Sequence, residues 1–103
     1  MSDTYRLLFP NKSLQKKFLK VLRIVHPVDF QDTIIEKVQG LKSNPRPHES
    51  SNFRSLRGKV RVSHYTAQYR LRIGNYRILY DVDDNERMVW ILALRKRGES
   101  TYK

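Results

Sequence analysis

The segment Tyr69-Arg-Leu-Arg-Ile-Gly-Asn-Tyr-Arg-Ile-Leu-Tyr80 predicts a β-hairpin. Gly74 and Asn75 separate two runs of alternating side chains, and a two-residue loop that begins with glycine is typical of a tight hairpin turn. This turn places Arg72 opposite Arg77, and alternation gives the hairpin two distinct faces. The apolar face predicts a core made of Tyr69, Leu71, Ile73, Tyr76, Ile78 and Tyr80, and the other face carries Arg70, Arg72, Arg77 and Leu79.

The polar face of this hairpin brings like charges together. Arg72 and Arg77 repel each other when they are directly opposed, at a cost of a few tenths to about 1 kcal/mol. A sequence selected for stability alone would place a carboxylate at one of these positions. The pair therefore indicates a site for a polyanion, which would supply the missing negative charge. The alternative interpretation is a solvated face on which both guanidinium groups extend into water.

Length and composition predict one folded domain over residues 1–103, with 39% hydrophobic residues. The chain has no cysteine, no apolar segment typical of a signal peptide and no apolar run long enough to cross a membrane, so we expect a cytoplasmic protein. Lysine and arginine number 21 against 10 acidic residues, a net charge of +11. This excess favours nucleic-acid or acidic-protein partners over a neutral small molecule.

The N-terminal half predicts a short strand and two helices. The strand covers 5–9, and apolar residues at helical spacing follow it from an N-cap at Ser13 to the break at His26-Pro27. A second helix, capped by Asp29, extends to Leu41, and residues 43–52 have the composition of a loop. The expected fold class is α+β: a small twisted antiparallel sheet of about four to five strands with the N-terminal helical hairpin packed on one face.

The remaining strands are predicted at 60–63, 69–73, 76–82 and 88–94, with a five-residue loop at 83–87. That loop length pairs Trp90 with Tyr80 and Leu92 with Ile78 on the core face. Ala93 is then expected beside Arg77 on the other face. This register is the assumption most sensitive to error, because a slip of one residue reverses the faces of a strand.

The sequence contains no motif for metal or cofactor chemistry. His26, His48 and His64 fall in unrelated places, and the four glycines form no phosphate-binding loop. The acidic residues cluster at helix starts and in the 83–87 loop, where they serve as caps and turn formers. We therefore expect neither a metal nor a cofactor.

Arginines and a tyrosine are the residues left for chemistry. The end of the last strand carries Arg95, Lys96 and Arg97 beside the hairpin, and Tyr102 follows. Positive donors of this kind hold a phosphate and offset the charge that develops on it in a transition state. An aromatic ring can stack on an unpaired base, which contributes about 1–3 kcal/mol. RNA carries its own nucleophile, the 2′-OH, so this arrangement suits cleavage of an RNA phosphodiester.

The segments 53–59 (Phe-Arg-Ser-Leu-Arg-Gly-Lys), 69–80, 95–97 and Tyr102 together resemble the RelE/ParE superfamily of bacterial toxins, especially its RelE-type messenger-RNA interferases. The resemblance implies metal-independent cleavage of ribosome-bound mRNA and neutralisation by a small acidic antitoxin. Lys16, Lys17 and Lys20 on the first helix are candidate contacts with ribosomal RNA. The resemblance also implies that basic residues hold the scissile phosphate and that the C-terminal tyrosine activates the 2′-OH or stacks on the substrate. The corresponding residues are Arg70, Arg72, Arg77, Arg97 and Tyr102.

Other residues are expected to support that site. Arginine barely titrates, so His64 is a candidate for the acid or base. The RNA backbone is expected to contact Lys59, Arg61, Arg95 and Lys96. Two alternatives remain open from the sequence: a ParE-type toxin that binds DNA gyrase and cleaves nothing, and a non-catalytic RNA-binding module.

Overall fold

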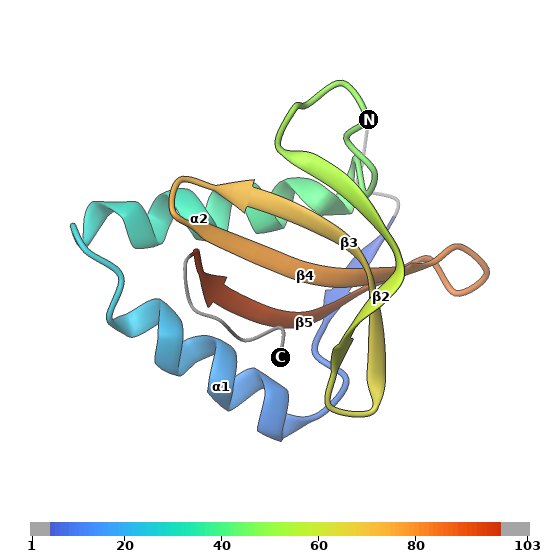
Figure 1. The fold of residues 1–103 in the computed structure, drawn as a ribbon, viewed down its shortest axis with the longest axis horizontal. Helices are drawn as coiled ribbons and strands as arrows, with labels where there is room; N and C mark the ends of the chain where they lie inside the picture. Colours follow the sequence, from blue (N-terminus) through green and yellow to red (C-terminus); the bar gives the residue numbers. More distant parts are fainter. Residues whose placement is uncertain (1–4, 98–103) are drawn as a thin grey trace.

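The computed structural model describes residues 5–97, which form a five-stranded sheet with two helices on one face (Figure 1). The sheet order is β1-β5-β4-β3-β2. The elements are β1 (Arg6–Leu8), α1 (Lys12–Arg23), α2 (Asp29–Gln39), the short 3-10 helix η1 (Gly40–Lys42), β2 (Phe53–Val62), β3 (Tyr65–Ile73), β4 (Tyr76–Asp83) and β5 (Met88–Lys96). This architecture confirms the predicted α+β class. The sheet is mixed, because β1 pairs with β5 in parallel while the other neighbours are antiparallel.

Both helices begin close to the predicted residues, with different capping. The side chain of Asn11 accepts a hydrogen bond from the backbone N–H of Leu14 at 2.9 Å, so Asn11 caps α1 and the predicted cap at Ser13 is wrong. Asp29 is the first residue of α2 rather than its cap. In that position its carboxylate interacts favourably with the positive end of the helix dipole.

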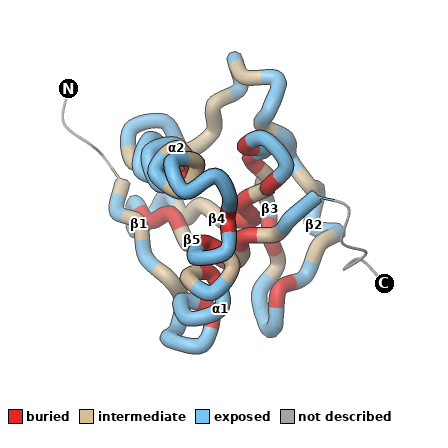
Figure 2. The backbone as a smooth tube through the Cα atoms, turned by 90° about the vertical axis from the view of Figure 1, so that its left-hand side faces the viewer, coloured by how far each residue is buried: buried red, intermediate tan, exposed pale blue. Residues whose placement is uncertain are grey.

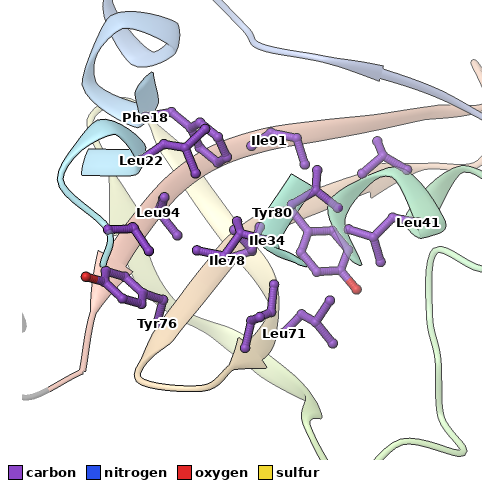
Figure 3. Close-up of a cluster of buried hydrophobic side chains, with 14 residues drawn as sticks. Phe18, Leu22, Ile34, Leu41, Leu71, Tyr76, Ile78, Tyr80, Ile91 and Leu94 are labelled. Carbon is purple, nitrogen blue, oxygen red and sulfur yellow. The ribbon is translucent and has the colours of Figure 1, made fainter. Parts of the chain in front are cut away.

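The main core lies between the helices and the sheet (Figure 3). Phe18 and Leu22 from α1 and Ile34 from α2 pack against the predicted apolar face of the β3–β4 hairpin. Tyr80 is fully buried there, and its hydroxyl donates a hydrogen bond of 2.7 Å to the carbonyl of Pro45. Burial raises the pKa of the Tyr80 hydroxyl. Buried positions are concentrated on the central strands, as Figure 2 shows.

The hairpin register is confirmed, whereas the register between β4 and β5 differs from the prediction. Ile73 pairs with Tyr76 and Arg72 pairs with Arg77, as the turn predicted. In β5, Ile91 rather than Trp90 lies opposite Tyr80, and a bulge follows between Leu79 and Tyr80. Asp83 pairs with Met88, so the loop between the strands is one residue shorter than predicted. Beyond Tyr80, the bulge shifts the pairing of β4 with β5 by one further residue.

This shifted register moves Trp90 and Leu92 out of the main core. Both belong to a second apolar cluster on the opposite face of the sheet, with Leu92 buried and Trp90 half-buried. The buried members of this cluster are Leu14, Val62, Ala67, Leu79 and Leu92. The strand β4 is therefore covered on both faces, and α1 contributes to both clusters. The predicted placement of Trp90 in the core beside Tyr80 is wrong.

Strand β2 begins at Phe53, seven residues before the predicted start of this strand. Its pairing with β3 is interrupted between Ser55 and Val60. Arg57 and Gly58 lie in this interruption with φ angles of 56° and 74°, a conformation that breaks the regular strand pattern. A sequence pattern that assumes strict alternation misses such a strand.

Candidate nucleic-acid interface

Three arginines on neighbouring strands form a row across the sheet, on the face away from the helix-covered core. Arg77 on β4 pairs with Arg72 on β3 and, on its other side, with Arg95 on β5. Residues paired in this way direct their side chains to the same face, and neighbouring strands lie about 4.8 Å apart. Arg72, Arg77 and Arg95 therefore span about 10 Å at their backbones. We refer to these three residues as the arginine row.

Arg95 occupies the position that the predicted register assigned to Ala93. Ala93 instead pairs with Leu79, one step further along the same face. The shift replaces open space beside Arg77 with a third guanidinium group. Arg77 consequently has an arginine as its cross-strand neighbour on both sides, which concentrates positive charge more strongly than the sequence alone indicated.

A second set of arginines lies two residues along the strands from the arginine row. Arg70 on β3 pairs with Arg54 on β2, and Arg70 pairs with Leu79 on its other side. Arg54 is exposed and Arg70 is half-buried. We refer to Arg54 and Arg70 as the arginine pair. It lies about 6.7 Å along the strand direction from the arginine row.

The end of β5 is attached to the turn between β3 and β4. The backbone N–H of Arg97 donates a hydrogen bond to the carbonyl of Asn75. Strand alternation directs Lys96, which pairs with Tyr76, to the face opposite Arg95. Arg97 directly follows β5, two residues beyond Arg95 and at the β3–β4 turn. Tyr102 lies outside the described residues.

The remaining predicted site residues lie on β2 and in the turn between β2 and β3. His64 is exposed in the turn between β2 and β3, at the far end of β3 from Arg72, about 26 Å of strand away. Figure 1 shows this turn and the β3–β4 turn at opposite ends of the ribbon. The structure therefore does not bring His64 to the arginine row. Lys59 and Arg61 are exposed beyond the interruption in β2, also away from the row.

Two carboxylates of the described residues 5–97 lie at the other end of β4 and in the turn that follows it. Asp81 is on the same face as Arg77 but four residues further along, about 13 Å away. Burial raises the pKa of the Asp81 carboxyl. Asp84 forms a bidentate ion pair with Arg46, at 2.9 Å between Nη2 and Oδ2. Within residues 5–97 no group of three metal-ligating side chains occurs, and no helix there is long and apolar enough to span a membrane.

Two contributors to this part of the molecule were missed from the sequence. Arg54 joins the site only because β2 extends past its interruption back to Phe53. Arg46 donates to the hydroxyl of Tyr69 at 2.8 Å and to Asp84, so it attaches the loop after η1 to β3 and to the β4–β5 turn. A basic residue in a proline-rich loop gives no periodic signal, so pattern analysis could not have found it.

Comparison with known proteins identifies the family of this chain. A family model described as the ParE toxin of a type II toxin–antitoxin system, parDE, matches residues 11–101. The candidate toxin RelE1 of Methanocaldococcus jannaschii is 32% identical over 93 residues, which cover 90% of this chain and 94% of that protein. The RelE–RelB complex of Pyrococcus horikoshii OT3 matches with a TM-score of 0.69 and 27% identity, over 94% of this chain and 99% of that one.

More distant structures share the fold. The RelBE2 toxin–antitoxin complex of Mycobacterium tuberculosis matches with a TM-score of 0.61 and 23% identity, over 91% of this chain and 99% of that one. A double arginine-to-alanine mutant of E. coli RelE in the free state matches with a TM-score of 0.55 and 22% identity, over 95% of this chain and 87% of that one. With a family model covering most of the chain and a relative above 30% identity, the chain belongs to the RelE/ParE family of toxins of type II toxin–antitoxin systems.

Proposed function

We propose that this toxin is an endoribonuclease that cleaves ribosome-bound mRNA and thereby stops translation. The observation that carries the proposal is the arginine row, in which Arg77 lies between Arg72 and Arg95 on one sheet face. Three adjacent guanidinium groups match the charge and the oxygen geometry of a phosphodiester. The similarity to the proteins described as RelE toxins supports the same assignment.

The reaction needs no nucleophile from the protein. The 2′-OH of the RNA attacks the adjacent phosphorus, its proton is transferred to a base, and the bond from phosphorus to the 5′ oxygen breaks. The products are a 2′,3′-cyclic phosphate and a 5′-hydroxyl that has taken up a proton. Negative charge accumulates on the phosphoryl oxygens in the transition state, where donors from the arginine row and Arg97 would stabilise it.

The arginines do not perform the proton transfers, because a guanidinium group stays protonated. The resemblance to RelE-type toxins assigns help with activation of the 2′-OH to Tyr102. The role of Arg72 as a ligand of the cleaved phosphate likewise follows from its position in that motif. In this proposal the chemistry proceeds without a metal, because the nucleophile is part of the RNA itself.

The test is primer extension on a translated mRNA that has been incubated with ribosomes and the purified protein. We expect discrete cuts with the natural protein, and a loss of about 100-fold or more in cleavage rate with Arg77→Ala, the magnitude typical of a removed transition-state donor. Arg6→Ala is the matched control, because Arg6 is an exposed arginine on the opposite edge strand. Equal cleavage by the Arg77→Ala protein would reject the proposed role of the arginine row.

A second candidate function is favoured by one observation, the description of the matching family model as a ParE toxin. ParE-type relatives are expected to bind DNA gyrase, which does not require a phosphate site for RNA. Growth arrest with DNA damage and intact transcripts would establish this alternative. RNA binding without cut products would instead indicate a non-catalytic RNA-binding module.

We also propose that a small acidic antitoxin neutralises the toxin. Two similar structures are described as RelE–RelB and RelBE2 complexes, and the net charge of +11 favours an acidic partner. An apolar groove of about 240 Å³ between β1, α1 and α2 fits one face of an amphipathic helix, and Leu8 and Ile35 in its lining are 41% and 42% exposed.

Co-expression with the product of an adjacent acidic reading frame tests this partner. Ile35→Glu is expected to abolish neutralisation of toxicity, because it places a charge in the groove. Ile24→Glu is the control, since Ile24 is 70% exposed and does not line the groove. If both variants were neutralised as well as the natural toxin, the groove would not be the antitoxin site.

A further inference from the structure

We infer that Arg54 and Arg70 form a second phosphate subsite, which holds the RNA phosphate next to the one that is cleaved. The inference rests on the proposed endoribonuclease function and extends it from a single phosphate to the path of the strand. It assigns a role to Arg54, a residue outside the motifs of the hairpin and of the C-terminal segment. Arg54 acts as a positioning residue, because it contacts the substrate backbone away from the reacting atoms.

The register places the arginine pair where the neighbouring phosphate has to pass. Arg54 pairs with Arg70, so both side chains leave the sheet on the face that carries the arginine row. The pair lies two residues from Arg72 along β3, about 6.7 Å. This offset is comparable to the length of one nucleotide in an extended RNA strand. A strand whose cleaved phosphate contacts the arginine row at Arg72 therefore presents its next phosphate to the arginine pair.

The surroundings of Arg54 leave room for this phosphate. The interruption of β2 between Ser55 and Val60 opens a hollow of about 560 Å³. Its lining consists of Arg54, Ser55, Leu56, Arg57, Lys59 and Val60. Three of these six side chains are cationic and none is acidic, so the hollow attracts an anion. Because β2 is the edge strand, the RNA can reach Arg54 without displacing another element.

Half-buried Arg70 and exposed Arg54 contribute differently to the subsite. Arg54 belongs to an edge strand and can follow a mobile phosphate, whereas Arg70 is held within the sheet by neighbours on β2 and β4. Replacement of Arg54 should therefore weaken RNA binding and leave the fold and the chemical step intact. This separation gives the inference a signature that a purely structural arginine would not show.

The first measurement is the affinity of the purified toxin for an eight-nucleotide single-stranded RNA. A 2′-deoxy residue at the cleaved position prevents attack, and a neutral methylphosphonate replaces one linkage at a time. We expect Arg54→Gln to weaken binding of the fully charged RNA about fivefold. When the linkage next to the cleaved one is already neutral, we expect Arg54→Gln to cause no further loss of affinity. The contact between Arg54 and that phosphate is then already absent. Arg6→Gln should bind every RNA like the natural protein.

The second measurement is cleavage of mRNA on ribosomes at varied toxin concentration. Arg54→Gln should raise the half-saturating concentration about fivefold and leave the maximal rate within about twofold. If natural protein and Arg54→Gln cleave alike and bind every RNA alike, the inference fails while the nuclease function stands. If the natural protein does not cleave, the nuclease function fails. If Arg54→Gln lowered RNA affinity by the same factor whichever linkage was neutral, Arg54 would have only a general electrostatic effect. This result would also overturn the subsite.

Discussion

Gly74 is the residue at which the hairpin turn and the helix packing depend on each other. Its φ angle is +59°, and a Cβ atom at this position would lie 2.6 Å from Cζ of Phe30. The ring of Phe30 also contacts Tyr76, with ring centroids 6.3 Å apart. The absence of a side chain therefore permits both the left-handed turn and the close approach of α2. This turn also holds Arg72 and Arg77 opposite each other.

Gly74→Ala should lower the free energy of unfolding by about 1–3 kcal/mol, from left-handed strain together with displacement of Phe30. Urea denaturation followed by circular dichroism measures this change. Gly40→Ala is the matched control, because a Cβ atom added to Gly40 would meet no atom within 4 Å and its φ is negative, so stability should change little. A Phe30→Leu change in the Gly74→Ala protein should restore part of the loss. Equal stability of the two alanine variants would contradict this explanation.

Arg72 is the residue at which the repulsion between opposed arginines can be tested. It is exposed and lies directly opposite Arg77. Arg72→Thr removes this repulsion with a residue that favours strands, so stability should rise by a few tenths to about 1 kcal/mol while RNA cleavage falls. Thermal unfolding and primer extension measure the two effects. Arg61→Thr, opposite Thr66 on the same sheet, should give no comparable gain in stability. A gain as large at Arg61 would show that repulsion is not the cause.

At the scale of elements, the β4–β5 turn is attached to two distant segments through Asp84. Arg46 from the loop after η1 and the hydroxyl of Tyr5 before β1 both donate to this carboxylate, Tyr5 at 2.7 Å. The hydrogen bonds from Arg46, followed by the one from Tyr5, lower the pKa of the Asp84 carboxyl below its ordinary value. One acidic side chain thus connects the N-terminal segment, the loop and the turn.

Asp84→Asn should lower Tm at pH 7, and the difference from the natural protein should shrink as the pH falls. A carboxyl whose pKa is lower in the folded state stabilises the protein above its unfolded pKa of about 3.9 and loses this contribution as the pH falls through the folded pKa. Scanning calorimetry between pH 7 and pH 2.5 measures the difference. Glu86→Gln in the same turn is the control for the loss of one negative charge there. A difference in Tm that stayed constant with pH would exclude the carboxylate as its source.

At the scale of the whole molecule, the two faces of the sheet differ in what covers them. The helices cover one face, and the second apolar cluster covers part of the other, which leaves the arginine row and the arginine pair beside it. The net charge of +11 adds a general attraction for nucleic acid. The contribution of the arginine row to RNA affinity should therefore be separable from that of the total charge by salt dependence.

The logarithm of the association constant for RNA should fall linearly with the logarithm of the salt concentration, with a slope of about −0.7 for each phosphate neutralised on a single strand. Arg77→Gln should make the slope less negative by about 0.7, and Arg6→Gln should leave it unchanged although the total charge falls equally. Fluorescence anisotropy with a short labelled RNA measures both slopes. Identical slopes for the two variants would indicate that RNA binds through diffuse charge rather than at the arginine row.

Local sequence was sufficient to predict the β3–β4 hairpin, its register and the opposition of Arg72 to Arg77, because a two-residue turn sets the pairing of strands that are adjacent in the chain. It was also sufficient for the two amphipathic helices, through their periodicity. Long-range packing was needed to bring Arg95 rather than Ala93 to Arg77, to join Arg54 to Arg70, to add β1 in parallel, and to separate His64 from the row. These features depend on the shortened turn and bulge of β4–β5, on the interruption of β2 and on pairings between distant segments. The free energy that stabilises these pairings comes from packing in the two apolar clusters, and no local pattern of residues encodes that packing.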